Sequence, residues 1–211
     1  MTNFQKRFFS SIILLPLSFF IIFQGNLYFQ ITLLFFLIIS LFEWMKMNLN
    51  IFIKIFGVIF IFFSFYSMHQ IRNSEGLESL SNFLIIFLIC VSSDLGGYFF
   101  GKIFKGPKLT KISPKKTYAG VIGGFIFSLL IIYFFIEYID VFYQTYDLNL
   151  FLYIILVSSC SQLGDLIISY FKRKSKIKDT GTIIPGHGGV LDRIDSMIFA
   201  FPIIYMFKYF I

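Results

Sequence analysis

Charged side chains are scarce in this sequence. Asp, Glu, Lys and Arg make up 14% of its 211 residues, whereas they make up about a quarter of an average soluble domain. Hydrophobic residues account for 57%, 32 residues are Phe, and the mean hydropathy is +0.83. This balance excludes an ordinary water-soluble domain and is typical of an integral membrane protein.

Cysteine is also rare. Cys90 and Cys160 are far apart, and each lies inside an apolar run, so the sequence contains neither a disulfide framework nor the ligand spacing of a metal site. We expect both to be small core residues. The sequence has no G-x-x-x-x-G-K-[ST] loop, and the acids near His187 lack zinc-ligand spacing. These absences exclude a Walker nucleotide site and a structural zinc site.

Long uncharged runs dominate what is present. A membrane-spanning helix needs about 20 mostly apolar residues. Because the runs are continuous rather than alternating, and because an open sheet edge is not tolerated in lipid, they favour helices over strands. We predict an all-α polytopic membrane protein with one domain over 1–211 and about six to seven transmembrane helices. The runs lie at about 8–24, 27–42, 51–68, 82–100, 119–139, 150–171 and 195–211, and Gln24-Gly25-Asn26 separates the first two.

The basic residues predict an orientation. With seven spans and a cytoplasmic N-terminus, 16 of the 18 Lys and Arg residues lie on the cytoplasmic side, and only Arg72 and Lys208 lie outside. Cytoplasmic loops of membrane proteins carry such an excess of positive charge. We therefore predict an N-in, C-out topology, and we interpret the net charge of +7 as a cytoplasmic face rather than a nucleic-acid-binding surface.

Two acids lie inside predicted spans. A carboxylate at the centre of a membrane helix costs about 2.5–3.5 kcal/mol on insertion scales, so Asp94 and Asp165 require water, a cation or a partner. Ser158, Gln162, Asp165 and Ser169 follow one another at spacings of four, three and four, which places them on one helical face. This polar face either lines a cavity or only joins helices by hydrogen bonds; the spacing leaves both interpretations open.

Glycines lie close to these acids. Gly97 and Gly101 are four residues apart, as are Gly120 and Gly124. This spacing lets helices approach closely. The alternative is that glycine beside Asp94 lets the backbone approach a ligand.

Two basic loops carry most of the remaining polar chemistry. The loop over 101–120 contains six lysines and precedes a helix, and lysines beside a helix N-terminus are a natural seat for phosphate. The second loop contains "KDTGTIIPGHGGVLDRIDS", Lys178 to Ser196, in which carboxylates alternate with cations and turn-forming glycines. This mixture suggests phosphates held with a hard cation such as Mg²⁺, which is usually bound by one or two carboxylates together with substrate phosphate.

These motifs resemble those of the phosphatidate cytidylyltransferases, also called CDP-diacylglycerol synthases. The run "SYFKRKSKIKDTGTIIPGHGGVLDRID", Ser169 to Asp195, is similar to the complete signature of that family. Other landmarks appear in order as "SDLGGYFFGK" from Ser93, "SPKKTYAG" from Ser113 and "SQLGD" from Ser161. Tyr118 and Ala119 stand where the family pattern has Trp and Glu, so any role of that acid is absent.

The resemblance implies a reaction of CTP with phosphatidate that gives CDP-diacylglycerol and pyrophosphate with Mg²⁺ as cofactor. It implies N-terminal helices over 1–80 and catalytic helices with cytoplasmic loops over 81–211, in a bacterial inner membrane. A homodimer stays open. The implied catalytic residues are Asp165, Asp192, Lys178, Asp179 and Arg193, with Asp165 and Asp192 as metal ligands. The implied substrate-binding residues are Ser113, Lys115, Lys116, Lys172, Arg173, His187, Gly188, Gly189 and Asp195, with Asp94 and Gln162 in support.

Two alternatives remain at this level. A CTP-dependent lipid kinase of the dolichol or phytol type would give a lipid phosphate and CDP. A small membrane transporter would line an ion path with Asp94 and Asp165. The densest polar chemistry lies in the predicted cytoplasmic loops rather than across the span, which favours an enzyme acting on a soluble nucleotide and a membrane lipid.

Overall fold

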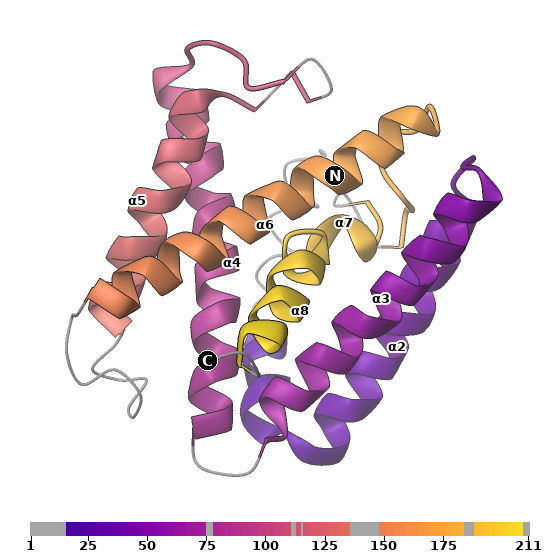
Figure 1. Ribbon diagram of the computed structural model, residues 1–211, viewed down its shortest axis with the longest axis horizontal. Helices are drawn as coiled ribbons and strands as arrows, with labels where there is room; N and C mark the ends of the chain where they lie inside the picture. Colours follow the sequence, from indigo (N-terminus) through magenta and orange to yellow (C-terminus); the bar gives the residue numbers. More distant parts are fainter. Residues whose placement is uncertain are drawn as a thin grey trace.

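The structure is a computed structural model that describes residues 16–74, 78–110, 113–114, 116–135, 148–183 and 188–208. The regular structure of these residues is helical, apart from isolated bridge residues such as the antiparallel pair Lys108 and Thr117. The all-α prediction is confirmed. A helix over 16–24 precedes α2 (Asn26–Lys46), α3 (Ile51–Arg72), α4 (Glu78–Phe104), α5 (Tyr118–Phe135), α6 (Leu148–Lys174), α7 (Leu191–Ile194) and α8 (Met197–Lys208) (Figure 1).

Five of these helices, α2 to α6, are long and apolar enough to cross a membrane, which confirms a polytopic membrane protein. The predicted break between the first two runs is present, because the chain leaves helical geometry at Gly25 with φ at +61°. The last run differs from a full span. It begins directly after the single turn of α7, and α8 has 12 residues, or about 18 Å of helix.

Glycines bring α4 and α5 together. A Cβ at Gly120 would lie 2.8 Å from the Gly97 carbonyl oxygen, and one at Gly96 would collide with the carbonyl of Gly123. The two helices therefore approach backbone to backbone, as small residues allow in membrane helices. The close-packing interpretation of the glycines is confirmed for this pair of helices, which lie side by side in Figure 1.

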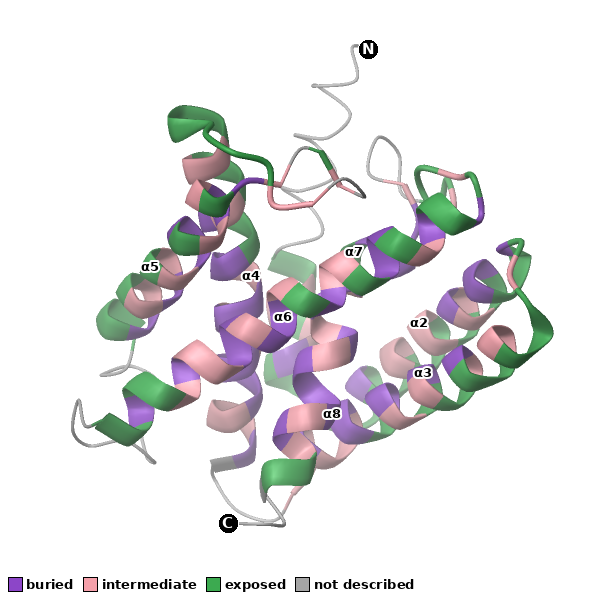
Figure 2. Ribbon diagram, turned by 45° about the horizontal axis from the view of Figure 1, so that its top comes forward, coloured by how far each residue is buried: buried purple, intermediate pink, exposed green. Residues whose placement is uncertain are grey.

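One hydrophobic core joins the N-terminal helices to the rest of the bundle. It includes Trp44 of α2, Ile61 of α3, Ile89 of α4, Val157 of α6 and Phe201 of α8. Figure 2 shows buried residues on the inward sides of the helices and exposed ones on the outward sides of α2, α3 and α5. The outward apolar side chains are the surface that lipid would cover.

The two cysteines behave as expected. Cys90 has no exposed surface and Cys160 is 8% exposed, and both are free thiols. The prediction of small core residues is confirmed.

Candidate active site

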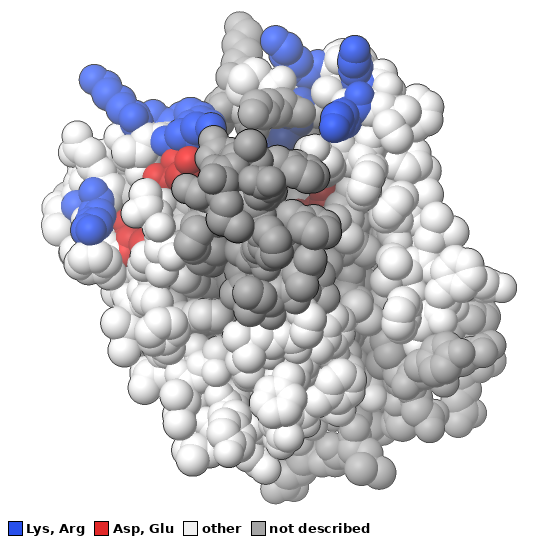
Figure 3. Space-filling model, turned by 180° about the vertical axis from the view of Figure 1, so that it is seen from behind, with Lys and Arg blue, Asp and Glu red and all other residues white. Residues whose placement is uncertain are grey.

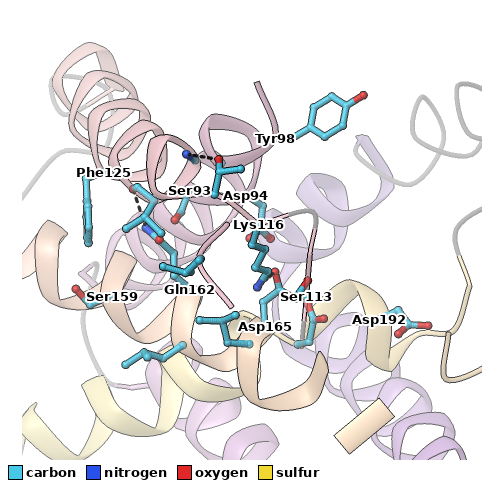
Figure 4. Close-up of a pocket in the computed structure, with 18 of the residues that line it drawn as sticks. Ser93, Asp94, Tyr98, Ser113, Lys116, Phe125, Ser159, Gln162, Asp165 and Asp192 are labelled. Carbon is cyan, nitrogen blue, oxygen red and sulfur yellow. Dashed lines mark hydrogen bonds and ion pairs between the residues drawn. The ribbon is translucent and has the colours of Figure 1, made fainter. Parts of the chain in front are cut away.

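A cavity of about 690 Å³ lies among α4, α5, α6 and the loop that leads into α7 and α8. Its wall joins residues from all four sequence landmarks. In Figure 4, Phe125 lies at one side of this cavity and Asp192 at the other, with Lys116 and Asp165 between them. The predicted site residues on this wall are Asp94, Ser113, Lys116, Gln162, Asp165, Lys172, Asp179, Asp192, Arg193 and Asp195.

The first basic loop folds back on itself and delivers Lys116 to the cavity. The Leu109 amide donates to the Lys116 carbonyl over 2.8 Å, and the Tyr118 amide donates to the Pro107 carbonyl over 3.2 Å. Thr117 then caps α5, because its hydroxyl oxygen accepts the Gly120 amide at 3.1 Å. These bonds hold Lys116 directly before the N-terminus of α5.

Lys116 pairs with Asp165, its Nζ lying 2.5 Å from the carboxylate Oδ2. In Figure 4 the lysine side chain points at this aspartate across the cavity. The other oxygen of Asp165 accepts the Ser169 hydroxyl at 3.3 Å. The Asp165 side chain remains 29% exposed, so it is open to a ligand.

The predicted polar face of α6 has two functions along its length. Gln162 and Asp165 line the cavity, whereas Ser158 Oγ lies 3.0 Å from Ser93 Oγ of α4. Gln162 connects the two parts, because its Nε2 donates to Ser158 Oγ at 3.3 Å and to the Val121 carbonyl at 3.4 Å. Both interpretations of the spacing are therefore correct, each for its own part of the helix.

Asp94 also faces the cavity rather than the end of its helix. α4 continues for ten residues beyond it, to Phe104. Its Oδ2 accepts the Ser196 hydroxyl at 3.1 Å, and its side chain is exposed to the cavity. Asp94 thereby joins α4 to the start of α8.

The loop before α7 surrounds the carboxylate of Asp192, which is 8% exposed. Its Oδ2 accepts the amides of Thr180 at 2.7 Å and Gly189 at 2.9 Å. Its Oδ1 accepts Lys172 Nζ at 2.8 Å. Gly188 has φ at +89°, and a Cβ there would lie 2.8 Å from Asp192 Oδ2, so this turn favours glycine.

Asp195 is buried behind this cradle, and its Oδ2 lies 3.8 Å from Lys172 Nζ. Burial raises the pKa of the Asp195 carboxyl well above its ordinary value, and the negative charge of Asp165 raises it further. Crowded carboxylates in a confined site favour a nearby cation because it removes their mutual repulsion.

The donor set of the cavity fits a hard divalent cation. Five carboxylates line it, from Asp94, Asp165, Asp179, Asp192 and Asp195, against three basic side chains. Within the described ranges, no three His, Cys, Asp or Glu residues come close enough to enclose an ion by themselves. Mg²⁺ rarely needs such a cage, since it usually binds one or two carboxylates and completes its shell with water and substrate phosphate.

The remaining predicted residues lie elsewhere. Arg173 and Lys178 are exposed and do not belong to the cavity wall, and Arg173 Nη1 donates to the Ile177 carbonyl at 2.9 Å. Gly188 and Gly189 form the turn beside Asp192. Lys115 and His187 lie outside the described residues.

Sequence reasoning missed three residues around the site, namely Glu43, Thr180 and Ser196. Glu43 of α2 is 2% exposed and accepts hydrogen bonds from the loop before α7. The available signal was an acid next to an apolar run, in "SLFEW". That signal was weak because Glu43 follows directly after the end of the predicted run at 42.

Comparison with known proteins identifies relatives of this chain. The chain is 46% identical to a phosphatidate cytidylyltransferase of Rickettsia bellii over 134 residues, which are 60% of this chain and 58% of that protein. Proteins of the same name from Rickettsia conorii and Staphylococcus haemolyticus are each 42% identical, over 63% and 62% of this chain and 60% and 49% of their own lengths.

The matched region is thus about half to three-fifths of the length of these relatives. The sequence profile described as "Cytidylyltransferase family" matches residues 48–211. This range contains the basic loops and every cavity-lining residue and begins after Glu43. With more than three quarters of its length in this match, the chain belongs to the cytidylyltransferase family.

Proposed function

We propose that this protein transfers the cytidylyl group of CTP to phosphatidate, which gives CDP-diacylglycerol and pyrophosphate for phospholipid biosynthesis. The name shared by the relatives supports this reaction. The observation that carries the proposal is the two-sided cavity. One part of its wall is charged, and another part is formed by Val121, Phe125 and Leu163, as a site for a phosphorylated lipid requires.

The chemistry needs little proton transfer. The acceptor phosphate has a second pKa near 6, so it is largely ionised at neutral pH and requires no general base. The main barrier is the repulsion between two polyanions. Cationic side chains that hold both reactants in line would supply most of the rate.

Lys116, Lys172 and Arg193 are the basic residues of the cavity wall, and we assign to them the binding of phosphate oxygens. Asp165 and Asp192 would hold Mg²⁺, which when bound neutralises developing charge on the phosphates. Asp192 is oriented for this purpose by the two loop amides and Lys172. Asp94, Gln162 and Asp179, which also line the cavity, would position bound water and ligand.

The location proposed for this chemistry is the cytoplasmic side of a bacterial inner membrane. Figure 3 supports it, since the visible lysines and arginines gather toward one end of the molecule and most of the remaining visible surface is uncharged. This distribution matches the positive-inside bias of the sequence. The homodimer stays a prediction.

Labelling of single cysteines tests the orientation. Cysteines placed at Lys102 and Lys174, in a Cys90→Ser and Cys160→Ser background, should react with an impermeant reagent only from the cytoplasmic side. A cysteine at Asp140 should react only from the outer side. Reaction of both basic positions from outside would refute this orientation.

A product assay tests the reaction. Purified protein in detergent is supplied with CTP, Mg²⁺ and phosphatidate, and the lipid and soluble products are separated. Formation of CDP-diacylglycerol together with pyrophosphate supports the proposal. Lipid phosphate with CDP, after a polyprenol or phytol-type alcohol is supplied, would identify a kinase instead, and the absence of any nucleotide turnover would favour the transporter alternative.

A further inference from the structure

Glu43 is a buried carboxylate that the proposed chemistry does not use. It lies on α2, is 2% exposed, and contacts the loop nearly 150 positions later in the chain. Its Oε1 accepts the Val190 amide at 3.0 Å, and its Oε2 accepts the Leu191 amide at 2.8 Å. The Thr180 hydroxyl lies 2.8 Å from the same Oε2.

The loop is shaped around this carboxylate. A Cβ on Gly181 would lie 2.5 Å from Glu43 Oε1, and a Cβ on Gly189 would overlap both Glu43 and Thr180. None of the ion pairs among the described residues includes Glu43. Donors of the loop therefore compensate its desolvation, which would otherwise be costly for a buried charge.

The loop segment that contacts Glu43 also contacts Asp192, the carboxylate proposed to hold the metal. Thr180 Oγ1 stands between Glu43 Oε2 at 2.8 Å and Asp192 Oδ2 at 3.0 Å. The amides bonded by Glu43 belong to Val190 and Leu191, directly before Asp192, while the Gly189 amide donates to Asp192 itself. Each of these contacts fixes one side of the turn that presents Asp192 to the cavity.

We infer that Glu43 is a positioning residue: it anchors the loop at Thr180 and at Val190-Leu191, so that Asp192 is held facing Lys172 and the cavity. An N-terminal helix thereby completes a site whose other groups lie after residue 90. The effect on turnover rests on the proposed function, whereas the anchoring of the loop does not.

Two measurements on Glu43→Gln test this inference. The amide keeps the size of the side chain but directs an NH₂ group at loop donors, so one or more of the three bonds is lost. Hydrogen exchange of the 188–194 segment in the purified full chain reports the anchoring, and the kcat and KM for CTP report the consequence. Ser40→Ala is the matched control, because Ser40 is buried on the same helix one turn away and its hydroxyl has no hydrogen-bond partner among the described residues.

In Glu43→Gln we expect exchange in this segment to be faster by about tenfold or more, with amides of α3 and α6 unchanged. We expect kcat to fall about tenfold or more, because a small displacement of a catalytic group is costly, and KM for CTP to change less than about threefold. Ser40→Ala should match wild type in both measurements. Unchanged exchange, or faster exchange with unchanged kcat, would overturn the inference.

If Glu43→Gln does not fold, a second variant, Thr180→Val, tests the same anchoring. It removes only the hydroxyl between the two carboxylates, so exchange should rise and kcat should fall in the same direction by a smaller factor. A Thr180→Val protein identical to wild type in both would refute the inference in that case. If wild type makes no CDP-lipid, the proposed reaction fails, and the exchange data alone still decide whether Glu43 anchors the loop.

Discussion

The two parts of the polar face on α6 have opposite surroundings. Around Ser158 the hydroxyls of Ser93 and Ser128 lie within 3.5 Å, and all three side chains are at most 1% exposed. Two turns along the same helix, Asp165 opens onto a large cavity and meets a lysine from another element. On this helix the neutral serines hydrogen-bond to one another and join helices, whereas the charged Asp165 lies where a ligand can reach it.

The difference has a simple energetic origin. A buried hydroxyl needs one or two hydrogen bonds, which neighbouring hydroxyls and helix carbonyls supply. A buried carboxylate needs positive charge or several donors. The cavity contains more carboxylates than basic side chains, and we propose that a cation bound together with the substrate supplies the missing positive charge.

Removal of divalent cations should have the largest effect on activity, which depends on the charged cavity around Asp165. Chelation should reduce nucleotide transfer to background, because the excess of carboxylates in the cavity then has no counter-charge. The helical content by circular dichroism should not change. Restored Mg²⁺ should restore the rate, and full activity in excess chelator would contradict the cation assignment.

Removal of a single cavity carboxylate should have the second-largest effect on activity. Asp165→Asn and Asp192→Asn should each lower kcat by about 100-fold or more, as for other groups that organise charge in a transition state. Rates are compared at equal amounts of protein recovered from the membrane, so that a folding defect is separated from a catalytic one. Near-normal turnover of either variant would remove that residue from the cation site.

Substitution of single lysines compares those that pair with cavity carboxylates with those that lie on the exposed surface. Lys116→Gln and Lys172→Gln should lower kcat/KM by about tenfold or more, because each meets a cavity carboxylate at 2.5–2.8 Å. Lys102→Gln and Lys105→Gln, at exposed positions that do not belong to the cavity wall, should change it less than about threefold. A surface charge that attracts anionic lipid contributes about 1 kcal/mol and is screened by salt.

Initial rates at low and high salt decide this prediction. If the four variants lose activity equally and salt removes the differences, the basic loops are a diffuse electrostatic surface without discrete phosphate ligands.

The smallest effect on activity is expected from a substitution in the cluster of Ser93, Ser128 and Ser158. Ser128→Ala removes a hydroxyl that lies 3.4 Å from the Ile89 carbonyl oxygen of α4 and 3.5 Å from Ser158 Oγ of α6. Such interhelical bonds contribute about 0.6 kcal/mol in membrane proteins, so the thermal midpoint should fall by a few degrees or less, with kcat unchanged. A large loss of kcat at normal stability would show that the serine cluster belongs to the site.

Much of the bundle follows from local sequence. Uncharged runs set α2 to α6, and the run of small residues around Gly96 and Gly120 indicates the close pair of α4 and α5. Asp192 stands in a loop whose composition suggests phosphate chemistry, and Asp165 is recognisable as an acid inside an apolar run. These features depend on neighbouring residues in the chain, so their pattern is visible without coordinates.

The contacts that complete the site depend on distant residues. Lys116 reaches Asp165 only because a hairpin of the basic loop lies over α6, and Glu43 reaches Val190 only because α2 packs beside the loop. No spacing or periodicity encodes such pairs.

The position of a radioactive label tests the central claim most directly. Wild-type protein and Asp192→Asn are each supplied with phosphatidate, Mg²⁺ and CTP labelled either at the α-phosphate or at the γ-phosphate. The account predicts that wild type places only the α-label in lipid, releases the γ-label as pyrophosphate in equal amount, and that Asp192→Asn does neither at a comparable rate. Transfer of the γ-label to lipid, or an undiminished rate in Asp192→Asn, would contradict it.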